Sequence, residues 1–103
     1  TENHGANLGN MFSSTTAYDG AGLSTWNIES ASFNDYFLRS SNNVSTANYN
    51  AILSEWASQN PTYSGSINFG NAQYDGTFGS TPSASRSQLE TVNGWVITDG
   101  GPV

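Results

Sequence analysis

Residues 45–69 have the sequence STANYNAILSEWASQNPTYSGSINF and contain the clearest secondary-structure signals of the chain. Apolar side chains recur there at the spacing of one helix face: Tyr49, Ile52, Leu53 and Trp56. Ser45 or Thr46 supplies a hydroxyl that can cap the first turn, and the proline that follows the pattern forbids further helix. The sequence therefore predicts a helix over 46–58 and, between two glycines, a short strand over 66–69.

The same order of elements recurs further along the chain. A proline suited to a first turn and Gly94, a suitable C-terminal glycine, predict a second helix over 82–93. Leu89 and Val92 are expected to face inward from it. A second strand is predicted over 95–98. Strands that alternate with helices favour parallel pairing, and the spacing of the two units falls within the roughly 20–50 residues of stacked repeats.

The first part of the chain, residues 1–44, is less regular. Its first apolar cluster, at residues 8–12, has helical spacing but room for only one turn. A short strand is predicted around Trp26–Ile28. A second cluster at 33–38 indicates one or two helical turns or a bend.

Composition limits the chain to a single small domain over residues 1–103. Hydrophobic residues make up 35% and aromatic residues 13%, which predicts a thin core rich in rings. There is no cysteine, so disulfides and cysteine-based zinc sites are excluded. No apolar run reaches the length of a transmembrane helix, and no signal peptide is visible. Because the chain starts at Thr1 rather than Met, we expect a processed product or a segment of a longer protein.

Charge restricts the partners of the chain. It contains no lysine, and the only cations are Arg39 and Arg86, so the formal net charge is −6. Such a chain lacks the basic surface that binds nucleic acid or anionic membrane. Arg86 and Glu90 are expected to form an i, i+4 ion pair on the outer face of the second helix.

Two segments in the first part resemble a known repeat. Residues 7–12 (NLGNMF) and 23–28 (LSTWNI) together are similar to one repeat of the BspA-like leucine-rich repeat family of bacterial surface proteins, the domain of unknown function 285 type. Residues 45–59 and 95–101 (WVITDGG) resemble the helix and the terminal strand of the segment that closes such repeats. On this resemblance, residues 1–44 are irregular repeats and residues 45–103 form a helix–strand–helix–strand closing segment.

The resemblance implies a short right-handed, leucine-rich-repeat-like α/β solenoid with a small parallel sheet and one or two helices. It implies a place on extracellular bacterial proteins or on bacteriophage proteins, in adhesive or structural roles without catalytic residues. The irregular first repeat argues against a long concave binding face.

No residue type in the chain singles out a catalytic site. His4 is the only histidine and lies in a polar N-terminal stretch, so a triad built on it is not expected. The candidates for a pair of catalytic carboxylates are Asp19, Asp35, Asp75 and Asp99. An aspartate in a turn more often caps the backbone, and no pair stands out. No metal site and no cofactor is assigned. Asp-Gly turns leave a calcium site open, but the twelve-residue calcium loop is missing.

Tyrosines supply the candidate binding residues. Tyr18, Tyr63 and Tyr74 are expected in loops, where aromatic rings dominate binding hot spots. The three tryptophans are expected to pack in the core instead.

The sequence therefore predicts a non-catalytic structural or adhesion module that is extracellular, on a cell surface or on a particle. Its partners would be a protein or glycan on a surface, or neighbouring subunits of an assembly. The alternative is a bacteriophage virion component of the same fold, such as a capsid decoration or tail-fibre protein. A glycan-acting hydrolase ranks last.

Overall fold

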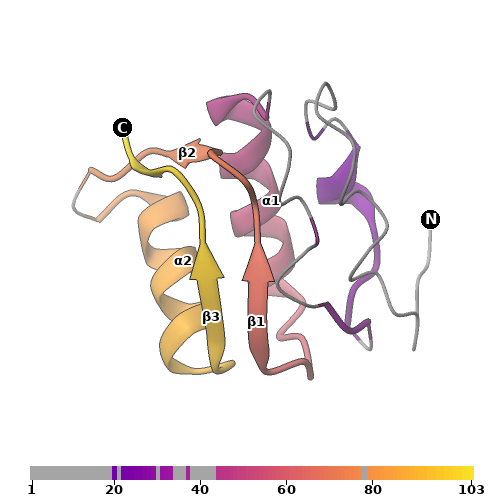
Figure 1. Ribbon diagram of the computed structural model, residues 1–103. Helices are drawn as coiled ribbons and strands as arrows, with labels where there is room; N and C mark the ends of the chain where they lie inside the picture. The colour runs from indigo at the N-terminus through magenta and orange to yellow at the C-terminus, as the bar shows by residue number, and fades with distance from the viewer. Residues whose placement is uncertain (1–19, 21, 30, 34–36, 38–43, 78) are drawn as a thin grey trace.

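Two helices and two small parallel sheets make up the regular part of the chain (Figure 1). The structure is a computed structural model and describes residues 20, 22–29, 31–33, 37, 44–77 and 79–103. In chain order the elements are the 3₁₀ helix η1 (Leu23–Thr25), α1 (Thr46–Ser58), β1 (Gly65–Asn68), β2 (Gln73–Tyr74), α2 (Thr81–Thr91), β3 (Trp95–Thr98) and β4 (Gly101–Pro102). The prediction of an α/β chain with a small parallel sheet and one or two helices is confirmed.

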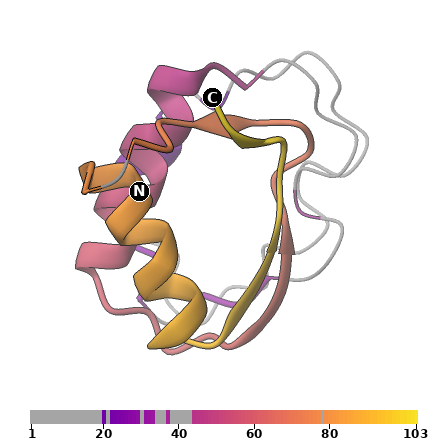
Figure 2. The same ribbon diagram turned by 90° about the vertical axis from the view of Figure 1, so that its left-hand side faces the viewer.

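The segment that contains α2, β3 and β4 lies alongside the segment that contains α1, β1 and β2. β1 pairs with β3 in parallel, with Gly65 opposite Trp95, and β2 pairs with β4, with Gln73 opposite Gly101. Each unit runs through a helix, a strand, a bend and a second short strand. Figure 2 shows both helices on one side of the molecule and β1 and β3 on the other, with the chain turning between them at both ends. Below, α1–β1–β2 is called the middle unit and α2–β3–β4 the last unit.

Local signals explain α1. Its cap is Ser45, whose hydroxyl accepts a hydrogen bond from the Asn48 amide at 3.1 Å. The buried face consists of Tyr49, Ile52, Leu53, Trp56 and Ala57. The helix ends just before Asn60, which takes a left-handed φ of 52°. The predicted range of 46–58 is confirmed.

The helix of the last unit is shorter than its predicted range of 82–93, and one of its side chains faces the other way. α2 begins at Thr81 and ends at Thr91, and Gly94 takes the left-handed φ of 78° that favours glycine there. Leu89 is buried as expected, but the expectation that Val92 faces inward is wrong, since its side chain is 71% exposed. Val92 follows the last helical residue, so it no longer continues the inward stripe of the helix.

The strand expected around Trp26–Ile28 is also wrong. η1 occupies the preceding residues, and Asn27 forms only an isolated bridge. A side chain takes the place of a strand partner here. The side-chain nitrogen of Gln59 donates to the Trp26 carbonyl, and its side-chain oxygen accepts from the Ile28 backbone amide, both at 2.7 Å.

The one-turn cluster predicted at residues 8–12 lies outside the described residues, and of 33–38 only Phe33 and Phe37 are described.

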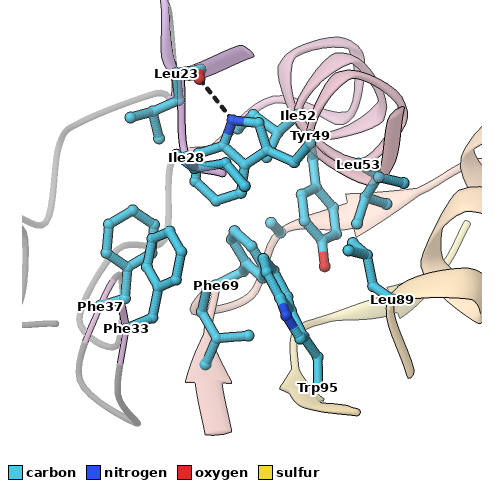
Figure 3. Close-up of a cluster of buried hydrophobic side chains, with 14 of the residues drawn as sticks. Leu23, Ile28, Phe33, Phe37, Tyr49, Ile52, Leu53, Phe69, Leu89 and Trp95 are labelled. Carbon is cyan, nitrogen blue, oxygen red and sulfur yellow. Dashed lines mark hydrogen bonds between the residues drawn. The ribbon is translucent and has the colours of Figure 1, made fainter. Parts of the chain in front are cut away.

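Aromatic rings fill the space between the helices and the strands (Figure 3). The Phe33 and Phe37 rings meet edge to face, with centroids 4.9 Å apart, and the Tyr49 and Phe69 rings are equally close. Edge-to-face and tilted arrangements of this kind add to the free energy gained by burial. Trp56 and Trp95 are buried and Trp26 packs against the same cluster, as the sequence predicts.

Candidate interaction surface

Side-chain amides link each unit to the segment before it. Gln59, just after α1, donates to the carbonyl of Trp26, and Gln88, in α2, donates to the carbonyl of Ala57 at 2.8 Å. The two links span 33 and 31 residues of sequence. The same type of contact therefore occurs twice, once between η1 and the middle unit and once between the middle and last units.

Indole groups make a second repeated link. The Trp56 indole N–H donates to the Leu23 carbonyl at 2.8 Å, across 33 residues. The Trp95 indole N–H donates to the Tyr63 carbonyl at 2.9 Å, across 32 residues. Figure 3 shows the first of these bonds at the top of the aromatic cluster. The Leu23 carbonyl also accepts from the Trp26 amide at 3.1 Å, so each indole adds a hydrogen bond, worth about 0.5–1.5 kcal/mol, to the apolar area that it buries.

Asparagine and threonine complete the junctions between units. The side-chain nitrogen of Asn93 donates to the Asn60 side-chain oxygen at 3.0 Å and to the Pro61 carbonyl at 3.1 Å. One unit earlier, the Thr62 backbone amide donates to the Glu29 carbonyl at 2.9 Å. Neutral polar groups thus join the units at the end where each helix leads into its strand.

Asp99 is the most heavily engaged carboxylate of the described residues. It lies just past β3, and its side chain is 3% exposed. It accepts hydrogen bonds from the Tyr49 hydroxyl at 2.5 Å, from Arg86 Nε at 2.9 Å and Nη2 at 3.2 Å, and from the Gly101 amide at 3.0 Å. Tyr49 lies on α1 and Arg86 on α2, so one carboxylate joins both helices to the end of the sheet.

The surroundings of Asp99 shift the pKa values of its partners. Burial, together with the charge and hydrogen bond of Asp99, raises the pKa of the Tyr49 phenol far above its ordinary value. Burial alone would lower the pKa of Arg86, but the hydrogen bonds and charge of Asp99 raise it above its ordinary range. Tyr49 therefore stays neutral and Arg86 stays charged. Both side chains thus act as fixed hydrogen-bond donors to Asp99.

Arg86 also makes the contact predicted from the sequence. Its Nη1 lies 3.0 Å from Glu90, the residue four positions later. Its guanidinium carbon lies 5.0 Å from the centre of the Tyr74 ring, within the range of a cation–π contact. The pairing with Asp99 was not predicted, because no local spacing rule joins residues thirteen positions apart in different elements.

The candidate binding tyrosines lie in different surroundings. Tyr63 is half-buried, its ring packs edge-on against Trp95, and its hydroxyl donates to the Ser66 carbonyl at 2.5 Å. Tyr74 belongs to β2 rather than to a loop, and its half-buried ring packs against Tyr49. Tyr18 lies outside the described residues. A binding role for these tyrosines stays a prediction.

The remaining candidate carboxylate of the described residues caps a turn. Asp75 accepts a hydrogen bond from the Thr77 amide at 3.0 Å, and hydrogen bonding to Thr77 lowers the pKa of its carboxyl. Asp19 and Asp35 lie outside the described residues. Over the described ranges there is no group of three or more histidine, cysteine or acidic side chains that could hold a metal ion, and no pocket.

The outer edge of β3 is the open side of the last unit. Gly94 and Thr98 direct their carbonyls to β1, where they accept from the Gly65 and Phe69 amides. Backbone groups alternate in direction along a strand, so those of Trp95 and Ile97 point to the opposite edge. Among the described strands, none pairs with that edge.

Exposed apolar side chains gather in the same unit. In the described part of the chain, the large hydrophobic residues that are exposed are Val92 (71%), Val96 (62%) and Val103 (76%). All three belong to or directly flank the last unit. No described helix is long and apolar enough to cross a bilayer.

Comparison with known proteins adds no relative. The chain matches no protein-family model, no curated protein and no solved structure.

Proposed function

We propose that the chain is a non-catalytic structural or adhesion module, built as a short right-handed solenoid of the leucine-rich-repeat-like kind and presented outside the cell, on a cell surface or on a particle. The repeated links between units support this proposal most directly. Glutamine amides and indole N–H groups reach carbonyls 31 to 33 residues earlier at two successive junctions. Recurring nearest-neighbour contacts of this kind are what hold a stacked array together.

The use of the polar side chains also favours a structural role. A general acid or nucleophile must be able to reach a substrate, but Asp99 is nearly buried and holds Tyr49 and Arg86. Asp75 caps its own turn. In this arrangement both carboxylates stabilise the fold by accepting hydrogen bonds from neighbouring groups.

Incubation of the purified chain with a glycan array and a panel of surface proteins tests the adhesion form of the proposal. We expect saturable binding, reduced by Tyr74→Ala, with circular dichroism as the check that the variant folds. Mass spectrometry of the same glycans should show no cleavage. Glycan fragments that accumulate with time and disappear in Asp75→Asn would favour the hydrolase and contradict the proposal.

A bacteriophage virion component of the same fold is a second candidate, and the open outer edge of β3 favours it. A short stack exposes strand edges that a larger assembly would cover. Mass spectrometry of purified particles from the source organism tests this candidate. Finding the chain in stoichiometric amounts would support it, and its absence would contradict it.

A further inference from the structure

We propose that the outer edge of β3 joins two copies of this chain across a two-fold axis, with the two β3 strands antiparallel. The inference goes beyond the adhesion or structural role, and its test does not depend on any ligand. It starts from the backbone groups of Trp95 and Ile97, which point away from β1. A strand edge with free donors and acceptors is a template for another strand.

Strand β3 contains none of the residues that commonly protect an edge from pairing. Proteins commonly protect an edge with lysine, proline or an inward-pointing charge. β3 consists of Trp95, Val96, Ile97 and Thr98, four residues of high β-propensity. Val96 is 62% exposed although it is apolar, and Val92 nearby in sequence is more exposed still.

Charge explains why a second copy can occupy this edge. A net charge of −6 opposes self-association over most surfaces. Residues 91–98 carry no charge at all, and the next residue, Asp99, is buried against Arg86. Glu90, on the other side, is paired with the same arginine. Two copies can therefore meet at β3 without bringing unpaired like charges together.

The hydrogen-bond pattern fixes the register of the proposed pair. In an antiparallel ladder, residues whose backbone groups point to the partner strand form the hydrogen-bonded pairs. Trp95 of one copy then pairs with Ile97 of the other, and the reverse, which makes four hydrogen bonds. Val96 lies on the axis opposite its own counterpart in a non-hydrogen-bonded pair, where Cα atoms are about 4.5 Å apart.

Four backbone bonds are a small contact, so the exposed valines and the outer side of α2 must supply further area. A stable dimer buries about 800 Å² per partner. We therefore expect a reversible dimer whose population rises with protein concentration, and not an obligate one.

Cross-linking tests the register directly, because the chain contains no cysteine of its own. Val96→Cys should oxidise to a covalent dimer of twice 10.9 kDa, since the expected Cα separation lies within the roughly 4.4–6.8 Å of disulfides. Ser66→Cys is the matched control, because Ser66 lies beside Val96 in the register of the sheet but one strand further from the edge. It should stay monomeric under the same oxidation.

Sedimentation equilibrium provides the second test. The wild-type chain should shift from monomer towards dimer as its concentration rises. Val96→Lys should stay monomeric, because it places two ammonium groups opposite each other, whereas Ser66→Lys adds the same charge and should still dimerise. Wild-type chain that is monomeric at every concentration would overturn the proposal, as would cross-linking that is equal in the two cysteine variants.

Discussion

Replacing Asp99 by asparagine should destabilise the fold strongly without changing the shape of the side chain. The substitution leaves Arg86 charged, 17% exposed and without its main counter-ion. Removing one partner of a buried ion pair typically costs about 3–5 kcal/mol. Arg86 keeps its contact with Glu90, and the new amide keeps one oxygen as an acceptor, so we expect a loss of about 2–3 kcal/mol in the free energy of unfolding.

Urea denaturation followed by tryptophan fluorescence measures this loss, because Trp56 and Trp95 are buried in the folded chain. With a slope of about 1–2 kcal/mol per molar urea, the midpoint should fall by about 1–3 M. Glu90→Gln is the control. It removes the other carboxylate of Arg86, but that side chain is 38% exposed, so the cost should stay below about 1 kcal/mol.

A double-mutant cycle separates the ion pair from other effects of the substitution. Arg86→Met combined with Asp99→Asn should cost less than the sum of the two single variants, with a coupling energy of about 1–3 kcal/mol. If Asp99→Asn costs no more than Glu90→Gln, or if the coupling energy is zero within error, the assignment of Asp99 as the main polar link of the two helices is refuted.

Three further substitutions test other contacts. The folded chain holds the pKa of Tyr49 above its unfolded value of about 10, so the unfolded chain ionises first and stability falls above about pH 10. Between pH 9 and 11, the free energy of unfolding measured with urea should fall more steeply with pH for the wild-type chain than for Tyr49→Phe, by up to about 1.4 kcal/mol per pH unit. An equal pH dependence in the two proteins would contradict this expectation. Trp56→Phe removes the indole donor of the Leu23 carbonyl, which keeps the Trp26 amide as a second donor, so the lost hydrogen bond should cost about 0.5–1.5 kcal/mol in the same assay, whereas a loss near zero would mean that water replaces the bond. Gly100→Ala would drive a Cβ into the Asn71 carbonyl oxygen, so its thermal midpoint should fall by several degrees, and an unchanged midpoint would show that the contact between the bends before β2 and β4 can open freely.

Helix α1 and strand β3 could be predicted to the residue because their signals are local. α1 has a capping serine and four apolar positions on one face, and β3 is bounded by a glycine and by the Asp99 turn. Strand β1 lies one residue earlier than the predicted 66–69, since Gly65 joins the ladder although glycine normally borders a strand, and the strand ends at Asn68. The coarse fold therefore follows from periodicity and from turn residues.

The errors in the first part of the chain and in the polar network have a common cause. The segment around Trp26 does not form the predicted strand because the Gln59 side chain, 33 residues later, satisfies its backbone. The Arg86–Asp99 pair likewise joins two elements, and the i, i+4 rule detects only the weaker partner, Glu90. Contacts that depend on how successive units stack leave no signal within a single window of sequence.

The reliance on amide and indole donors between units has a consequence for the conditions that the fold tolerates. Gln59, Gln88, Asn93 and both buried indoles donate to neutral oxygens, so dissolved ions have no charge to screen at these junctions. The Arg86–Asp99 ion pair, within the last unit, is shielded by burial. Stacking of the units should therefore be nearly independent of ionic strength from dilute buffer to sea-water salt.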